Sequence, residues 1–258
     1  MELYEQAKQF VIEASEYIKK EMEQGLTVES KSSLNDLVTN VDKGCEAFLY
    51  DKIMSHYPDH RIVGEEGHGH DIQDTDGVLW IIDPIDGTLN FVHQQKNFAI
   101  SVGIYIDGKP HSAFILDVMN HDLYHSSPGG AVYFNDQKLE RIEPSPLETS
   151  LICLNARWLV KDVSQNAALT LAKKAGTVRS YGSSALELAQ ITTGQVASYV
   201  TYQLKPWDFA AGLILVERLG GVVTTETGQP INLLQASGLV AAHPSMHKEI
   251  IEIINAKK

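Results

Sequence analysis

Two carboxylates stand three residues apart at the end of an apolar run. The stretch WIIDPIDGTLNFVH carries Asp83, then Pro84, then Asp86. A strand that ends in a carboxylate delivers that group to the rim of a sheet, where ligands bind. Pro84 fixes its own φ and biases the preceding residue toward extended geometry, so the spacing predicts a rigid turn between the two acids.

The residues that follow add an anion site to these acids. Gly87 allows the backbone to approach a ligand closely. Thr88 opens the segment LNFVH, for which we predict a short helix whose first N–H groups point outward. Two hard oxygen ligands beside a phosphate cradle suit Mg²⁺ far better than Zn²⁺.

Further acids lie near predicted strand ends. Glu65 and Glu66 follow the strand-like run RIVG, Asp208 follows a strand and a proline, and Asp42 lies in the first turn of a helix. Asp often serves as a turn or N-cap residue, and Glu66 suits a solvated loop, so each has an alternative interpretation. A shared metal site would give all of them one purpose.

A covalent mechanism is disfavoured by the spacing. Phosphatases with an aspartate nucleophile carry the letters D-x-D-G-T, in which the second acid comes two residues after the first. The position two before Asp86 is Pro84, so a nucleophile at Asp83 lacks that partner.

Composition and charge restrict the class of protein. The chain has 258 residues, 43% hydrophobic and 21% charged, which is typical of a soluble globular protein. Its net charge of −12 argues against a nucleic-acid surface, and bound divalent metal would let it hold an anionic substrate.

We expect no membrane contact, because no apolar run approaches the ~20 residues of a membrane span. The acidic, helix-patterned N-terminus is no secretory signal, and Cys45 and Cys153 suit a reduced core, so we expect a cytoplasmic location.

The apolar pattern of the first 135 residues predicts two helices and then strands. Helical spacing runs from Leu3 to about Met22, and a capping-box pattern at Thr39 and Asp42 opens a second helix. Strands are predicted at 61–64, 78–82, 98–106, 111–119, 122–126 and 130–134. The predicted strands 98–106 and 111–119 flank Asp107-Gly108, a hairpin turn signal.

The proline-containing segment 140–150 is the predicted boundary between two halves. Beyond it, strands at 151–155, 177–182, 197–202, 221–225 and 238–242 alternate with helices near 163–174 and from Ser183, Asp208 and Pro244. The predicted fold class is α+β, a layered αβαβα sandwich. Its antiparallel-rich N-terminal half spans 1–143, and its α/β C-terminal half spans 144–258.

Several motifs together resemble one family. WIIDPIDGTLNF, GEEG and LKPWDFAAGLILVERLGG are similar to the motifs of the inositol monophosphatase family of Mg²⁺-dependent, lithium-sensitive phosphatases. KSSLNDLVTNVD at 31–42 and RSYGSSALELAQITTGQ at 179–195 also fit, so the resemblance covers nearly the whole chain. It implies hydrolysis of a small phosphate ester by activated water, with two or three Mg²⁺ ions and no phosphoenzyme.

The resemblance also implies roles for single residues. Glu65, Asp83 and the carbonyl of Ile85 would hold the first metal, and Asp83, Asp86 and Asp208 the second. Thr88, paired with Asp42, would orient the attacking water, so the implied catalytic residues are Thr88, Asp42 and Glu65. The N–H groups of Gly87 and Thr88 would hold the phosphate, beside Asp86 and Asp208. Lys31 matches a lysine near the site of family members.

The resemblance also implies where the substrate binds. Gly182, Ser183 and Ser184 would line the sugar pocket. Thr201 stands where inositol-preferring relatives often carry a glutamate, so a different polyol phosphate is an alternative to inositol monophosphate. Relatives also act on fructose 1,6-bisphosphate, NADP(H), 3′-phosphoadenosine phosphate and histidinol phosphate. Some members also bind transcription machinery, apart from their phosphatase activity, and this non-enzymatic role is a further alternative. The family implies a homodimer.

Four other side chains, on three segments, have alternative interpretations. His68 and His70 have H-x-H spacing without a third ligand, which favours an exposed mobile loop over a transition-metal site. Trp207 is expected to pack rather than to stack on substrate. Arg179 is expected to brace the fold rather than to contact substrate.

Overall fold

The computed structural model describes residues 2–30, 37–161 and 167–256. Lys31 lies outside these ranges. Within them, no helix combines the length and apolar character that crossing a bilayer requires.

Two helices form the first layer. α1 spans Leu3–Gln24 and buries a stripe that includes Phe10, and α2 spans Asn40–His56. The predicted capping box begins α2, because Asp42 Oδ2 accepts from the Thr39 N–H at 2.9 Å while the Thr39 hydroxyl caps the helix. Both helices pack against one face of a sheet around Trp80 and Phe114.

That sheet has the strand order β3-β4-β5-β6-β7-β8-β9. Its strands are β3 (Arg61–Gly64), β4 (Val78–Asp86), β5 (Ala99–Ile106), β6 (Lys109–Asp117), β7 (Asp122–Ser126), β8 (Val132–Phe134) and β9 (Gln137–Lys138). β3 and β4 pair parallel and all other neighbours antiparallel, with the predicted hairpin at Asp107-Gly108 joining β5 and β6. A separate pair, β1 (Val28–Ser30) and β2 (Leu37–Thr39), precedes α2.

The second sheet lies in the C-terminal half and has the order β11-β10-β12-β14-β13. Its strands are β10 (Leu151–Leu154), β11 (Thr177–Arg179), β12 (Ser198–Leu204), β13 (Val222–Thr224) and β14 (Ser237–Ala242). β10 pairs parallel with β11 and β12, whereas β14 pairs antiparallel with β12 and β13.

The remaining helices separate or cover the sheets. They are α3 (Thr88–Gln94), the 3₁₀ turn η1 (Leu147–Thr149), α4 (Arg157–Val160), α5 (Ala167–Lys174), α6 (Ser184–Thr192), α7 (Pro206–Arg218) and α8 (Pro244–Ile254). α7 is buried on both sides: Ala210 and Ile214 pack on the first sheet, and Phe209 and Leu213 on the second. A helix apolar all round belongs between two layers.

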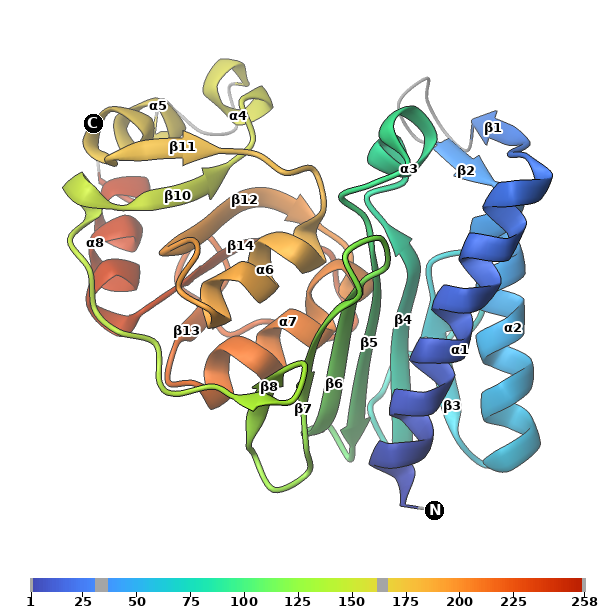
Figure 1. Cartoon of the computed structure of the whole chain (residues 1–258). Helices are drawn as coiled ribbons and strands as arrows, with labels where there is room; N and C mark the ends of the chain where they lie inside the picture. Colours follow the sequence, from blue (N-terminus) through green and yellow to red (C-terminus); the bar gives the residue numbers. More distant parts are fainter. Residues whose placement is uncertain (1, 31–36, 162–166, 257–258) are drawn as a thin grey trace.

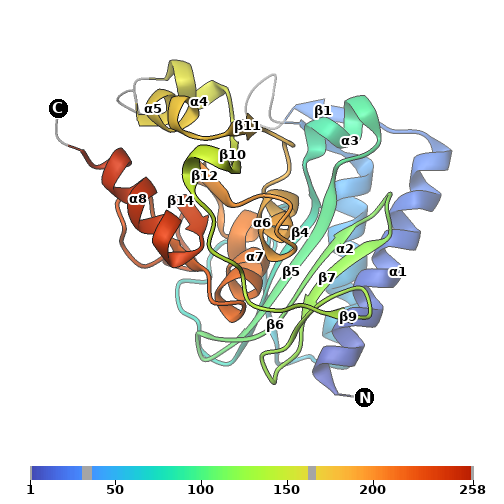
Figure 2. The ribbon, with the colours of Figure 1, turned by 60° about the vertical axis from the view of Figure 1, so that its left-hand side comes forward.

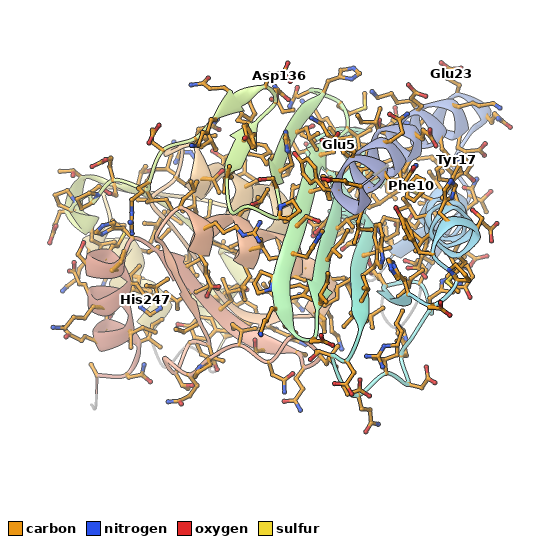
Figure 3. The ribbon with its side chains drawn as sticks, turned by 90° about the horizontal axis from the view of Figure 1, so that it is seen from below. Glu5, Phe10, Tyr17, Glu23, Asp136 and His247 are labelled. Atoms are coloured by element: carbon orange, nitrogen blue, oxygen red, sulfur yellow. The ribbon has the colours of Figure 1, made fainter. Side chains whose placement is uncertain are left out.

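The layers therefore follow the order α1/α2, first sheet, α6/α7, second sheet, and α5/α8, as Figures 1 and 2 show. Figure 3 places Phe10 of α1 and His247 of α8 at opposite ends of this stack. The predicted αβαβα sandwich is confirmed. The division at residue 143 stays a prediction, and in the structure the segment 140–146 connects the two sheets.

Candidate active site

The two acids of the opening motif share one face of β4, and a register shift is the reason. Asp83 pairs with Ser101 of β5 and Asp86 with Ala99, so three steps along β4 match two along β5. In a regular strand, residues three apart point to opposite faces, but one extra residue restores the same face. The prediction of a rigid turn between the two acids is wrong, because β4 continues as a strand through Pro84 to Asp86.

The alternation along β4 explains why this face receives the acids. Leu79 and Ile81 point toward α6 and α7, and Trp80 and Ile82 point toward α1 and α2. Asp83 lies on the same face of β4 as Leu79 and Ile81. Ile85 lies on the opposite face, with Trp80 and Ile82. Pro84, which donates no ladder hydrogen bond, stands at the irregularity, where a strand tolerates it.

The start of α7 brings the third acid to the same place. α7 begins at Pro206, two residues before the predicted start, and Asp208 Oδ2 accepts from the N–H of Lys205 at 2.7 Å. Asp208 is thus a capping residue and a member of the site at once. Tyr105 of β5 donates to the carbonyl of Ala210 at 2.7 Å, which anchors α7 on the first sheet.

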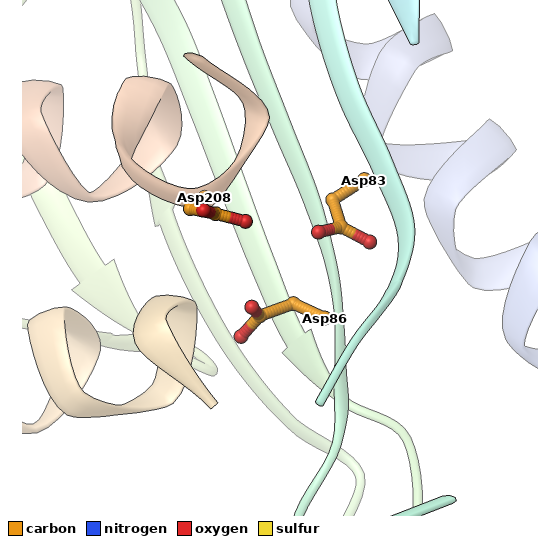
Figure 4. A group of neighbouring side chains, drawn as sticks. All are labelled: Asp83, Asp86 and Asp208. Atoms are coloured by element: carbon orange, nitrogen blue, oxygen red, sulfur yellow. The ribbon is translucent and has the colours of Figure 1, made fainter. Parts of the chain in front are cut away.

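Asp83, Asp86 and Asp208 form one cluster. Each offers a carboxylate oxygen, and these oxygens all lie within 4.8 Å of one another. Figure 4 shows Asp83 of β4 and Asp208 of α7 facing each other across the gap, with Asp86 below them. Asp83 is 1% exposed and Asp86 6%. Three carboxylates so close and so buried repel one another unless a cation or protons intervene.

The pKa values of the three acids are raised first by burial and then by that repulsion. Burial raises the pKa of Asp83 well above its usual range, and the charges of Glu65 and Asp86 raise it further. Burial raises the pKa of Asp86 to about 6, although bonds from Ser183 and Ala185 oppose the shift. Burial and then the charge of Asp86 raise the pKa of Asp208. Buried, hard, oxygen-only donors of this density fit a divalent cation such as Mg²⁺.

The fold fixes the orientation of each carboxylate. Asp83 Oδ1 accepts from the N–H of Ile85 at 3.0 Å. Asp86 Oδ2 accepts from the N–H of Ala185 at 2.8 Å and from the Ser183 hydroxyl. Since Ser183 caps α6, Asp86 also ties the first sheet to the C-terminal half.

Thr88 and Asp42 are brought together beside this cluster. The Thr88 hydroxyl lies 3.3 Å from Asp42 Oδ1 and 3.2 Å from the carbonyl oxygen of Ile85. The other oxygen of Asp42 is held by the capping box at Thr39. Burial raises the pKa of Asp42, and the charge of Glu65 adds to the shift.

Glu65 follows β3 and is half-buried. Its carboxylate is not among the three that converge within 4.8 Å, yet its charge acts on Asp42, Asp83, Asp86 and Asp208. The structure therefore places Glu65 at the rim of the cluster.

Gly87 adopts a φ of +96° at the start of α3. A Cβ there would lie 3.2 Å from the carbonyl oxygen of Gly182 and from Cβ of Ser183, so the absence of a side chain lets the two loops approach. Asn90 of α3 holds the same junction by donating to the carbonyl of Tyr181 at 2.6 Å.

A cavity of about 200 Å³ lies next to Ser183. Four of the five substrate residues predicted in the C-terminal half line it, namely Gly182, Ser183, Ser184 and Thr201, whereas Asp208 lies in the carboxylate cluster. Glu187 and Tyr199 form its buried wall, and Arg157 is the one Lys or Arg side chain among its described lining residues.

Sequence reasoning missed three polar residues that shape this site. They are Glu46, Asn90 and Glu187, which are all buried. Glu187 accepts from the N–H groups of Tyr181 and Gly182 at 2.5 and 3.2 Å. Their only signal was a polar residue among apolar ones on a predicted helix, and that signal does not reveal a distant partner.

The other expectations have mixed outcomes. The rings of His68 and His70 stack on Tyr50 and Trp207, with centroids 4.2 and 5.6 Å apart, so both histidines are held by aromatic contacts. The expectation that Trp207 packs is confirmed. Arg179 bonds its own strand at Thr177 and Val178, as a bracing residue does.

Comparisons with known proteins agree on one family. The sequence model described as "Inositol monophosphatase family" matches residues 1–258. An inositol-1-monophosphatase of Bacillus subtilis is 44% identical, over 100% of this chain and 98% of the relative. A fructose-1,6-bisphosphatase/inositol-1-monophosphatase of Thermotoga maritima is 33% identical (88% and 86% covered), and Nus factor SuhB of Escherichia coli 34% (86% and 84%).

Solved structures are also similar to this chain over almost its whole length. Inositol monophosphatase II of Staphylococcus aureus superimposes with a TM-score of 0.91 at 43% identity, covering 98% of this chain and 92% of that one. A complex of SaIMPase-II with inositol monophosphate has a TM-score of 0.89 at 41% identity (98% and 93%). An IMPase/NADP phosphatase with Mg²⁺ and phosphate has 0.90 at 28% identity (99% and 97%).

Proposed function

The chain belongs to the inositol monophosphatase family, and from that membership and its site geometry we propose that it hydrolyses inositol monophosphate with Mg²⁺. It is a phosphoric monoester hydrolase. The observation that carries the proposal is the convergence of the Asp83, Asp86 and Asp208 carboxylates within 4.8 Å. The similarity to an inositol-1-monophosphatase over the full chain and to a structure with bound inositol monophosphate supports the substrate.

The same carboxylates are the proposed metal ligands. Glu65, Asp83 and the Ile85 carbonyl would hold one Mg²⁺, and Asp83, Asp86 and Asp208 a second. Bound Mg²⁺ would lower the pKa of water and neutralise charge on the leaving oxygen. The positive charge would also offset the burial and the mutual repulsion that raise the pKa values of these acids.

The protein's own groups supply the rest of the mechanism. Thr88, hydrogen-bonded to Asp42, would orient the attacking water. The N–H groups of Gly87 and Thr88 at the start of α3 would hold the phosphate. Gly182, Ser183, Ser184 and Thr201 would contact the polyol in the cavity. Catalysis then rests on positioning and electrostatics, and no phosphoenzyme forms.

The first experiment is phosphate release from inositol 1-phosphate, fructose 1,6-bisphosphate, NADP⁺ and 3′-phosphoadenosine phosphate. Each assay runs with Mg²⁺, without it, and with added Li⁺, with Asp86→Asn as the blank. We expect Mg²⁺-dependent release, inhibited by Li⁺ and fastest with inositol 1-phosphate. No release from any substrate by protein that binds Mg²⁺ would contradict the proposal.

Arg157 separates the substrate alternatives. A second phosphate needs a cationic partner, and Arg157 is the described cation that lines the cavity. If fructose 1,6-bisphosphate is the faster substrate, Arg157→Ala raises its KM and leaves inositol 1-phosphate nearly unchanged. If inositol 1-phosphate is preferred, Arg157→Ala changes the KM of either substrate little.

A non-enzymatic role is the second candidate, because the chain is 34% identical to a protein named Nus factor SuhB. Capture of a stoichiometric transcription partner by both wild type and Asp86→Asn would support it.

A cytoplasmic location and a homodimer are also proposed. The buried, free thiols of Cys45 and Cys153 support a reducing compartment, and light scattering tests the dimer.

A further inference from the structure

Glu46 of α2 is a buried acid with no place in the proposed mechanism. Its side chain is 1% exposed, and both of its carboxylate oxygens bond to the loop that follows β3. Oε2 accepts from the N–H of Glu66 at 2.7 Å. Oε1 accepts from the N–H of His68 at 3.4 Å and lies 2.6 Å from Nδ1 of the same residue.

The loop is shaped around this carboxylate. A Cβ at Gly64 would lie 2.4 Å from Glu46 Oε2, so glycine is what lets the carboxylate sit beneath the loop. The N–H of Gly64 donates to the carbonyl of His68 at 2.9 Å, which closes the loop into a compact turn. The His68 ring stacks on Tyr50, one turn beyond Glu46 on α2.

The far side of the loop contacts α7. Nε2 of His70 lies 2.9 Å from the carbonyl oxygen of Gly64, and the His70 ring stacks on Trp207. Trp207 immediately precedes Asp208. The loop is thus held between α2 and the residue next to one member of the carboxylate cluster.

Glu65 lies between Gly64 and Glu66, both of which adjoin Glu46. We propose that Glu46 is a positioning residue, which fixes the backbone around Glu65 so that its carboxylate meets the metal beside Asp83. The inference rests on the proposed function. Groups that orient metal ligands without touching the metal change its affinity by roughly 10–100-fold when lost.

A merely structural role predicts something different. A buried carboxylate that only supports α2 would change the stability of the fold and leave the metal affinity alone. A purely electrostatic role would depend on the charge of Glu46 rather than on its hydrogen bonds. Two variants and one control separate these three possibilities.

The variants are Glu46→Ala, which removes every bond to the loop, and Glu46→Gln, which removes the charge but keeps an acceptor for the Glu66 N–H. The control is Ile53→Ala, which removes a buried side chain from the same helix without touching the loop. Two quantities are measured. They are the Mg²⁺ dissociation constant by calorimetry, and the exchange rate of the Glu66 and His68 amide hydrogens in metal-free protein.

We expect Glu46→Ala to weaken Mg²⁺ binding by about 10–100-fold and to speed exchange of the Glu66 amide by about tenfold. Glu46→Gln should recover most of both effects. Ile53→Ala should lower the melting temperature without changing either. If Glu46→Ala does not fold, the single variant Gly64→Ala replaces it, because its methyl group would meet the Glu46 carboxylate. Gly64→Ala must then show both losses, and Glu46→Gln stays as the variant that keeps an acceptor.

Unchanged Mg²⁺ affinity in Glu46→Ala would overturn the proposal, as would a Glu46→Gln variant as weak as Glu46→Ala. Failure of the proposed function is seen separately. Wild-type protein that binds Mg²⁺ but releases no phosphate contradicts the substrates and leaves the calorimetric test of Glu46 intact. The exchange measurement needs neither metal nor substrate.

Discussion

The hydroxyl of Thr88 lies 3.3 Å from a carboxylate oxygen of Asp42, a residue 46 positions away in the sequence. One participant opens α3 and the other belongs to the capping box of α2, so two helix starts meet at this bond. A hydroxyl that donates to a carboxylate becomes a better acceptor for the proton of a neighbouring water. This geometry gives Asp42 a use beyond the capping box of α2, as the partner of the Thr88 hydroxyl.

Replacing Thr88 by valine tests that use. Valine keeps the shape but removes the hydroxyl, so we expect Thr88→Val to lower kcat by roughly 10²–10⁴-fold. The KM and the Mg²⁺ affinity should change little. Steady-state kinetics over a range of Mg²⁺ concentrations checks this. Thr88→Ser, which keeps the hydroxyl, should retain most of the rate, and equal losses in both variants would contradict the assigned role.

Asp86→Asn should nearly abolish turnover while the fold survives. One shared carboxylate accounts for several kcal/mol of barrier, and each ~1.4 kcal/mol is tenfold in rate. Without Mg²⁺ the variant should be at least as stable as wild type, because it lacks one repelling charge. The matched control is Asp107→Asn in the β5–β6 turn, where asparagine tolerates a φ of +51°. A near-wild-type rate in Asp86→Asn would rule out the metal assignment.

Mg²⁺ affinity should rise with pH. Burial raises the pKa values of Asp83, Asp86 (to about 6) and Asp208, and metal binding requires their deprotonated forms. At pH 5.5, below the pKa of about 6 of Asp86, protons compete more strongly for the carboxylates than they do at pH 8. Calorimetry at both values should give weaker binding at pH 5.5, with release of protons. Equal affinity at the two pH values would refute the prediction.

Glu187 should make the metal-free protein less stable as pH rises. Burial raises the pKa of its carboxyl to about 7 from an ordinary value of 4.5. The folded state therefore binds the proton more tightly than the unfolded state. Its contribution to stability is fully present below pH 4.5 and is lost as pH rises through 7. The difference is on the order of 3 kcal/mol.

Glu187→Gln should flatten that pH dependence. Its amide oxygen still accepts from the N–H groups of Tyr181 and Gly182, and it carries no charge to desolvate. Urea unfolding in EDTA at pH 5 and pH 8 measures the change in both proteins. The same substitution at exposed Glu5 should leave the dependence unaltered. A Glu187→Gln variant with the wild-type slope would show that this carboxyl is not responsible.

Local patterns predicted most of the elements. Helical spacing identified α1, the capping box identified the start of α2, and Asp107-Gly108 identified the β5–β6 hairpin. These signals depend on neighbours within a few residues, so they survive without tertiary context. The motifs likewise named Asp83, Asp86 and Asp208 before the structure brought them together.

By itself, the sequence determined the family, the layered architecture and the set of acids available for metal binding. Only the tertiary structure decided how Asp83 and Asp86 share a face, because the one-residue shift exists only relative to the partner strand β5. It also decided that Glu46 supports the Glu65 loop and that Glu187 supports the turn at Gly182. A buried polar group takes whichever donors the packing brings near, and those donors are not local in sequence.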